Sequence, residues 1–283
     1  MVFLVLSTVL SVVFIGCSHS PVAPVPETAS PLPPALAKTV FAESRGCFLL
    51  YEMKTNSFRK VVGEEICRER FVASSTFKVP LAVMAFDSGA LRDEKQVLKW
   101  DGKVDSRKEV NRDHDARTWM RDSVVWFSQR LTPKIGLKKI EKYLHDFKYG
   151  NEDMTGGLQE AWLVSPALPE PSLRVSAYEQ IEFLKKLWRD ELPVSKRAMR
   201  LARKITYLET SPGGFLLNGK TGSNFFDPER TKHLGWFVGH LEKEGREYLF
   251  ATVFSDLHPS IDGFGGPRAK QMTKDWLASE GLW

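Results

Sequence analysis

Short apolar runs separated by turn residues occur near both ends of the chain, beyond its N-terminal segment. Residues 46–53 (GCFLLYEM) and 57–62 are strand-like and flank a Thr55-Asn56 turn, which together predict a β-hairpin. Near the C-terminus, three more strands are predicted over 215–218, 234–241 and 248–254. Strands therefore account for both ends of the folded part.

The middle of the chain carries apolar residues at helical spacing. Residues 75–88 (STFKVPLAVMAFDS) predict a helix, and 115–147 predict two helices that are separated at Thr132-Pro133. Residues 176–188 predict a helix that begins with a Ser-x-x-Glu capping box. A closing helix is predicted over 267–277.

The order of these elements and the composition restrict the class of protein. Strands on both sides of a helical middle predict an α+β domain, an antiparallel sheet flanked by helices with a helical insertion at about 95–205. With 283 residues, 42% of them hydrophobic and 27% charged, the chain can bury a core, which excludes a disordered, fibrous or multi-span membrane protein. The net charge of +5 is too small to indicate a nucleic-acid partner. The six histidines show no metal-ligand spacing, so no metal site is expected.

The N-terminal segment predicts export. Residues 1–15 are almost entirely apolar, and they resemble a secretory signal peptide more than a membrane span. They lead into Gly16-Cys17, which resembles a bacterial lipobox, so 1–17 is expected to be a signal peptide with Cys17 as a candidate lipid anchor. The Pro- and Ala-rich residues 18–38 predict an extended tether, and 39–283 the folded domain. We expect an exported, periplasmic protein; plain secretion and an uncleaved anchor are the alternatives to lipidation.

Three cysteines are too few for a disulfide framework. If Cys17 is lipidated, Cys47 and Cys67 remain as an even pair in an oxidising compartment. A bridge between them would close a loop of about 20 residues, and two buried free thiols are the alternative.

A serine followed three residues later by a lysine begins the predicted helix 75–88. Positions i and i+3 share one face of a helix, so the Lys78 amine can reach the Ser75 hydroxyl. Serine becomes a good nucleophile when a nearby base takes its proton, and burial would keep the lysine neutral for that task. The motif alone is not specific, because Ser57 and Lys60 have the same spacing inside a predicted strand, where they face opposite sides.

Two further motifs lie downstream. Ser123, in DSVVWFSQ, offers a second hydroxyl that could relay a proton to a leaving nitrogen. Lys220-Thr221-Gly222-Ser223 can present a cation and a hydroxyl to an anionic substrate, while the glycine permits close approach of the backbone. Residues 214–221 also match the phosphate-loop pattern G-x-x-x-x-G-K-T. However, the residues before this lysine are strand-like and those after it form a turn rather than a helix, so no nucleotide site is expected.

The order of these motifs is that of serine β-lactamases and penicillin-binding proteins. From about residue 47 to the C-terminus the chain resembles the class D (oxacillinase-type) β-lactamases. The residues that carry the resemblance are Ser75-Thr76-Phe77-Lys78, Ser123-Val124-Val125-Trp126, Tyr149-Gly150-Asn151, Trp162-Leu163, 219–223 (GKTGS) and 235–239 (GWFVG). The resemblance implies a β-lactamase/transpeptidase-like fold with a helical subdomain.

The resemblance also implies a reaction, the hydrolysis of the β-lactam ring of penicillin-type antibiotics through an acyl-enzyme on Ser75, which confers antibiotic resistance. In the family, the lysine that matches Lys78 is N-carboxylated by CO2 and the resulting carbamate is the general base, and no other cofactor is implied. Ser123 would protonate the β-lactam nitrogen. The remaining implied site residues are Ser223, with Ser75, for the oxyanion hole; Lys220, Thr221, Gly222 and Arg268 for the substrate and its carboxylate; Trp162 as donor to the carbamate; and Val125, Tyr149 and Asn151 as supporting residues.

Three other functions remain alternatives at this point. A penicillin-binding protein or β-lactam sensor would be acylated on the same serine without turnover. A D-alanyl-D-alanine peptidase would use the site on cell wall, and a structural lipoprotein would carry an inactive site, although each catalytic position is filled. The expected partner is a small β-lactam, and the substrate range and the oligomeric state stay open.

Overall fold

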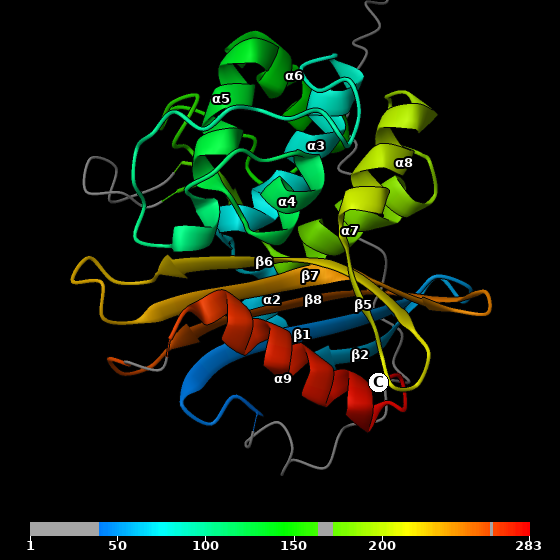
Figure 1. Cartoon of the computed structure of the whole chain (residues 1–283). Helices are drawn as coiled ribbons and strands as arrows, with labels where there is room; N and C mark the ends of the chain where they lie inside the picture. The colour runs from blue at the N-terminus through cyan, green and yellow to red at the C-terminus, as the bar shows by residue number, and fades with distance from the viewer. Residues whose placement is uncertain (1–39, 164–171, 261–262) are drawn as a thin grey trace, which may run out of the picture.

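The protein consists of a six-stranded antiparallel sheet with helices on both faces (Figure 1). The structure is a computed structural model that describes residues 40–163, 172–260 and 263–283. The strands are β1 (Ser44–Glu52), β2 (Ser57–Val62), β3 (Phe71–Val72), β4 (Arg174–Val175), β5 (Tyr207–Thr210), β6 (Leu216–Phe225), β7 (His233–Lys243) and β8 (Arg246–Asp256). The helices are α2 (Glu64–Arg68), α3 (Lys78–Asp87), α4 (Ala116–Arg121), α5 (Val125–Ile135), α6 (Leu137–Phe147), α7 (Ala177–Trp188), α8 (Lys196–Ile205) and α9 (Gly265–Ser279), with short 3₁₀ helices η1 (Ser74–Phe77) and η2 (Lys108–Val110).

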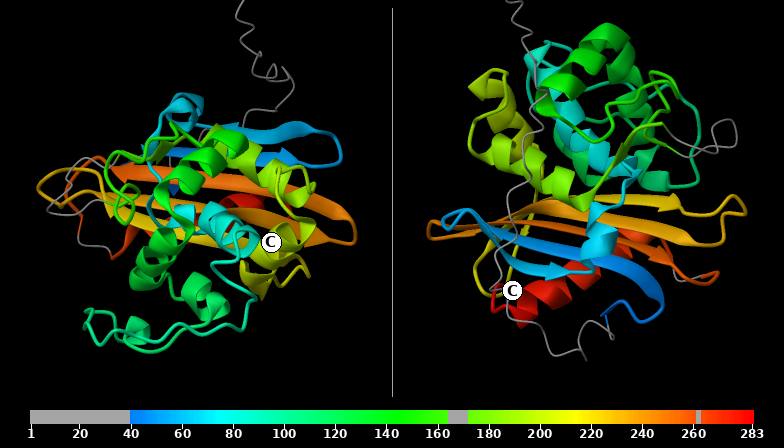
Figure 2. Two further views of the ribbon diagram at one scale, coloured as in Figure 1. Left: turned by 90° about the horizontal axis from the view of Figure 1, so that it is seen from above. Right: turned by 180° about the vertical axis from the view of Figure 1, so that it is seen from behind.

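The sheet joins the two ends of the described chain. Its strand order is β2-β1-β8-β7-β6-β5, so the N-terminal hairpin pairs with the C-terminal strands. Helix α9 covers one face and the other helices form a layer on the opposite face (Figure 2). Because both faces are covered, β7 and β8 are buried along most of their length, which explains their nearly continuous apolar sequence. The expected α+β fold is confirmed.

One core lies on each face of the sheet. Beneath α9, Trp276 stacks on Phe48 of β1 with ring centroids 5.6 Å apart. The larger core lies between the sheet and the helical layer, where α3 is buried along nearly its whole length. A fully buried helix of this kind places its first turn, which includes Lys78, inside the protein.

The helical layer differs in one detail from the sequence prediction. Residues 115–147 form three helices, not two, and Pro133 lies inside the last turn of α5 instead of separating helices. Proline removes a single hydrogen bond there, and α5 ends at Gly136, whose φ of 87° favours glycine. The predicted capping box of α7 is present: the Ser176 side chain accepts from the Glu179 N–H, and the Glu179 carboxylate accepts from the Ser176 N–H.

Cys47 of β1 and Cys67 of α2 form a disulfide, so the bridge is correct and the free-thiol alternative is wrong. It fastens α2 to the sheet. The expected signal peptide (1–17), Cys17 and the tether (18–38) lie outside the described residues. Within the described part of the chain, none of the helices has the length and apolar character that a bilayer crossing requires.

Candidate active site

The serine–lysine pair lies where η1 runs into α3. Lys78 is fully buried, and its Nζ lies 3.0 Å from the Ser75 Oγ. Burial, with smaller contributions from the charges of Lys220 and Arg107, holds the pKa of Lys78 well below its usual value. A neutral amine at hydrogen-bond distance can accept the hydroxyl proton of a serine, so the predicted pair is assembled.

The backbone next to the nucleophile is under a local constraint. Ser74 has a φ of 50°, a left-handed conformation that is uncommon outside glycine, and it is completely buried. Gly222 of β6 packs against it: a Cβ at Gly222 would lie 3.2 Å from the Ser74 Cβ and 3.3 Å from the Thr76 Cγ2. The glycine of the Lys-Thr-Gly motif thus lets β6 lie directly against the turn that carries Ser75.

The strand β6 presents its motif with alternating side chains. Thr221 and Ser223, two positions apart, both line the pocket that contains Ser75. The Ser223 Oγ accepts from the Gly266 N–H at 2.8 Å, which joins β6 to the start of α9. Lys220 is buried, and its Nζ donates to the Thr221 carbonyl at 2.8 Å. Burial, and secondarily the charge of Arg107, lower the pKa of Lys220 to about 7.

Ser123 enters the pocket from a turn between α4 and α5. Its φ of 55° is left-handed, which turns the chain sharply after Asp122. The Asp122 carboxylate accepts from Arg121 at 2.6 Å and from Arg112 at 3.1 Å. The backbone carbonyl of Asp122 accepts from the Arg107 Nη1 at 3.3 Å. Three arginines therefore hold the residue that precedes Ser123 in place.

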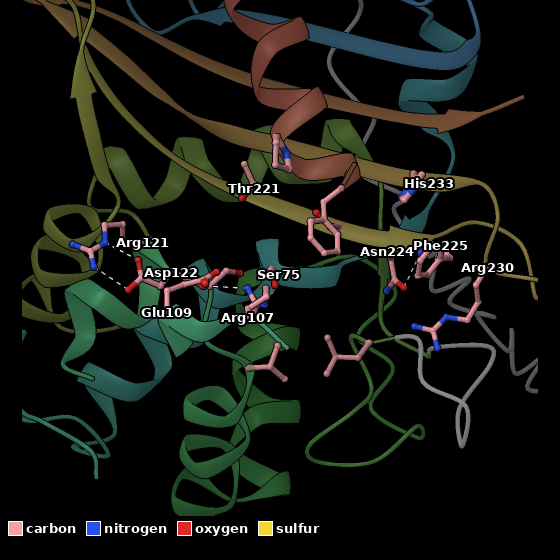
Figure 3. A pocket seen from close by; sticks show the side chains of 16 residues that line it. Ser75, Arg107, Glu109, Arg121, Asp122, Thr221, Asn224, Phe225, Arg230 and His233 are labelled. Atoms are coloured by element: carbon pink, nitrogen blue, oxygen red, sulfur yellow. Dashed lines mark hydrogen bonds and ion pairs between the residues drawn. The ribbon is translucent and has the colours of Figure 1, made fainter. Parts of the chain in front are cut away.

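These segments enclose a cavity of about 560 Å³, within the size range of small-molecule sites (Figure 3). The predicted residues Ser75, Ser123, Val125, Thr221 and Ser223 all line it. The other lining residues are Arg107, Glu109, Arg121, Asp122, Leu163, Asn224, Phe225, Arg230, His233, Phe264 and Pro267.

Three of the predicted supporting residues lie behind this surface. Tyr149 is buried, and its hydroxyl accepts from Gln180 Nε2, which also donates to Thr76 Oγ1 at 2.9 Å. Burial raises the pKa of this tyrosine. Asn151 donates to the Ser172 carbonyl at 2.7 Å and accepts from the Arg174 N–H at 2.8 Å, so it fixes the loop near β4.

Trp162 is fully buried against Phe77, the residue that precedes Lys78, with ring centroids 4.9 Å apart. Its indole Nε1 has no hydrogen-bond partner among the described residues. Buried indole N–H groups usually find an acceptor, so the Trp162 N–H is available as a donor.

Arg268 is not brought to the pocket. Its guanidinium forms a two-pronged ion pair with Asp256, at 3.0 and 2.8 Å, and lies over the Phe254 ring. Asp256 is almost fully buried at the end of β8, where a carboxylate requires a cationic partner. The expected grip of Arg268 on a substrate carboxylate therefore has no support in this geometry.

Two groups of lining residues have no counterpart in the sequence motifs. Arg107 and Glu109 come from the polar segment around η2, which gave no signal in the sequence. Phe225 continues the alternation of Thr221 and Ser223 along β6, so it lies on the same side of the strand. Across the described ranges, no group of three or more histidine, cysteine, aspartate or glutamate side chains could hold a metal ion.

A buried lysine beside a serine at a helix start, a second serine across the pocket, and Lys-Thr-Gly on the facing strand define an acyl-transferring enzyme with an active-site serine. The family profile of the penicillin-binding protein transpeptidase domain matches residues 46–278. The chain is similar to β-lactamase OXA-1 of Escherichia coli, at 40% identity over 78% of this chain and 79% of that protein. It is also similar to the probable β-lactamase YbxI of Bacillus subtilis, at 35% identity over 86% and 83% of the two chains.

Solved structures agree with these sequence relatives. The class D β-lactamase BAT-2 superposes with a TM-score of 0.77 at 32% identity, over 87% of this chain and 96% of that one. The chain belongs to the class D β-lactamases, which are serine hydrolases of cyclic amides.

Proposed function

We propose that this protein hydrolyses the β-lactam ring of penicillin-type antibiotics through an acyl-enzyme on Ser75 and thereby confers resistance. The observation that carries the proposal is the buried lysine 3.0 Å from the serine, whose pKa burial lowers well below its usual value, beside a cavity lined by Ser75 and other residues of the family motifs. The Ser75 Oγ attacks the lactam carbonyl carbon, the ring C–N bond breaks, and water later hydrolyses the resulting ester.

Different residues of this chain have separate roles in these reaction steps. The backbone N–H of Ser75 lies in the first turn of η1, where N–H groups lack intrahelical acceptors, and with the Ser223 N–H it would hold the oxyanion. The Ser123 hydroxyl donates its proton to the departing ring nitrogen. Thr221 and Lys220 bind the substrate carboxylate from β6, and Val125 helps to keep water away from Lys78.

The site fits an N-carboxylated Lys78. Reaction with CO2 requires a neutral amine, which burial provides, and the unpaired indole N–H of Trp162 is a donor that lacks an acceptor. When bound as a carbamate, CO2 supplies a carboxylate-like general base next to Ser75. No metal or organic cofactor is proposed.

We also propose that the protein is exported to the periplasm and anchored there by a lipid on Cys17. The apolar residues 1–15 ahead of Cys17 support export, and so does the disulfide, because disulfides persist in oxidising compartments. Labelled fatty acid should appear on the full-length protein and not on Cys17→Ser; equal labelling of both would contradict lipidation.

The test of the activity is a stopped-flow trace with a chromogenic cephalosporin in the presence of bicarbonate. Many turnovers per enzyme are expected, and Ser75→Ala should abolish them. A burst of one equivalent that then stalls would identify a sensor or penicillin-binding protein instead. Retained hydrolysis in Ser75→Ala would overturn the mechanism.

A further inference from the structure

One end of the active-site cavity is lined by Asn224, Phe225, Arg230 and His233. In Figure 3 these residues lie to one side of Ser75, and Arg107, Glu109 and Asp122 lie to the other. The first group belongs to the end of β6, the start of β7 and the turn between them.

Arg230 is the strong cation at this end of the cavity. It is exposed, and its guanidinium lies over the Phe225 ring with its carbon 4.9 Å from the ring centroid. Stacking of this kind holds a guanidinium in place while leaving its N–H groups available to an anion. Over the described ranges, the Arg230 side chain forms neither an ion pair nor a hydrogen bond.

The nearby acidic groups are otherwise engaged or point elsewhere. The Asp227 carboxylate accepts from the N–H groups of Thr231 and Lys232 and from the Thr231 hydroxyl, so its own turn uses it. Glu229, next to Arg230 in the turn, makes no ion pair with it in the described structure. The acidic residues that line the cavity, Glu109 and Asp122, belong to the opposite group. Among the described residues that line this end of the cavity, none is acidic and Arg230 supplies a permanent positive charge.

The chemistry of a β-lactam decides which substituent reaches this end. In a penicillin, the ring carboxylate and the acylamino side chain lie on opposite sides of the lactam carbonyl. If the carbonyl is at Ser75 and the ring carboxylate is at Lys220 and Thr221, the acylamino side chain extends along β6 in the other direction. That direction leads past Ser223 and Phe225 toward Arg230 (Figure 3).

We propose that Arg230 is a specificity-determining residue that binds a carboxylate on the acylamino side chain, so that the enzyme favours β-lactams with an anionic side chain. The inference rests on the proposed β-lactam hydrolysis. Because Arg230 is solvent-exposed, its contribution is that of a surface ion pair, about fivefold in kcat/KM. Salt should weaken it, because exposed charges are screened.

The test compares two penicillins that differ by one side-chain carboxylate. Carbenicillin carries a carboxylate on the α-carbon of the side chain of benzylpenicillin. The kcat/KM ratio of carbenicillin to benzylpenicillin should fall about fivefold in Arg230→Gln, whereas Arg230→Lys should retain most of it. Added salt should lower the ratio in the wild type and leave it unchanged in Arg230→Gln.

Arg246→Gln is the matched control. Arg246 also lies over a phenylalanine ring, with its carbon 5.1 Å from the centroid of Phe215, but it does not line the cavity. The kcat/KM ratio of carbenicillin to benzylpenicillin in Arg246→Gln should equal that of the wild type. A second pair, 6-adipoylaminopenicillanic and 6-hexanoylaminopenicillanic acid, places the carboxylate on a longer, flexible chain.

The inference is overturned if Arg230→Gln leaves the ratio unchanged for both pairs. If the wild type does not hydrolyse benzylpenicillin, the proposed function is refuted instead. In that case the acylation rates of the same pairs still decide whether Arg230 binds the side-chain carboxylate.

Discussion

Replacement of Trp162 by phenylalanine tests the chemistry of the lysine pocket. Trp162 is fully buried and its indole N–H has no partner in the described structure. Phenylalanine keeps the contact with Phe77 and removes only the donor and one ring. If the donor serves a carbamate on Lys78, the change should weaken the reversible reaction with CO2 and leave the fold intact.

The size of the effect follows from the burial. A hydrogen bond to a charged acceptor contributes about 1.5–3 kcal/mol, and a buried donor without a partner costs about 1–3 kcal/mol. Bicarbonate activation of Trp162→Phe should therefore require roughly 10- to 100-fold more bicarbonate than the wild type. In buffer free of CO2, the free energy of unfolding of Trp162→Phe should stay close to that of the wild type, because removal of the unpaired donor offsets much of the stability lost with the smaller side chain.

The assay is a bicarbonate titration followed by the carbamate carbon signal in NMR and by the hydrolysis rate. Trp276→Phe is the matched control, because its indole Nε1 is also buried without a partner, but on the far side of the sheet beneath α9. Its half-saturating bicarbonate concentration should equal that of the wild type. The same concentration for Trp162→Phe would refute the assignment of Trp162 as the carbamate donor.

Three further outcomes are expected. Lys78 must lose a proton before CO2 can react with it, so activity should fall as the pH drops through the lowered pKa of Lys78. Arg107→Gln removes a positive charge, raises that pKa and should move the acid limb of kcat/KM upward by up to about one pH unit, whereas Arg107→Lys should not. Replacing both Cys47 and Cys67 with alanine should lower the free energy of unfolding by about 3 kcal/mol in denaturant titrations, with kcat unchanged because the bridge is remote from the cavity. Arg268→Ala should destabilise the fold by about 3 kcal/mol, since it strands the buried carboxylate of Asp256, and an increase in KM for penicillins without destabilisation would restore Arg268 as a substrate ligand.

Local patterns made much of the fold predictable. The capping box at Ser176 depends on neighbouring residues, so α7 begins where the sequence indicates. The helix predicted from Ser75 instead begins as the 3₁₀ helix η1 and becomes α-helical at Lys78. The end of α5 was not predictable, because Pro133 is tolerated in a last turn and Gly136 supplies the left-handed φ that stops the helix. Strand β6 extends to Phe225 although its Gly-Ser-Asn sequence predicts a turn, because pairing with β7 continues over those residues.

The sequence motifs predicted which residues belong to the candidate site, but not where each side chain points. Arg268 shows the difference: it stands in the first turn of α9, and a neighbouring position on a helix points about 100° away. The rotation of α9 is set by contacts such as the fully buried Ala269 and Trp276, which no local motif reveals. Because Arg268 is paired with Asp256, the proposed recognition of the ring carboxylate would fall to β6.

That arrangement makes the protonation states of Lys78 and Lys220 oppose each other. In the proposed mechanism, Lys78 would have to be neutral to react with CO2, whereas Lys220 would have to be charged to attract a carboxylate. Burial lowers the pKa of both, and the charge of Lys220 further lowers that of Lys78. A substrate carboxylate would favour the charged form of Lys220, so binding itself restores the cation that the empty site suppresses. A carbamate on Lys78 would add a negative charge to the same buried region and favour a charged Lys220 as well. The two lysines, 142 residues apart by number, are both buried and their charges act on each other, so the protonation of one depends on that of the other.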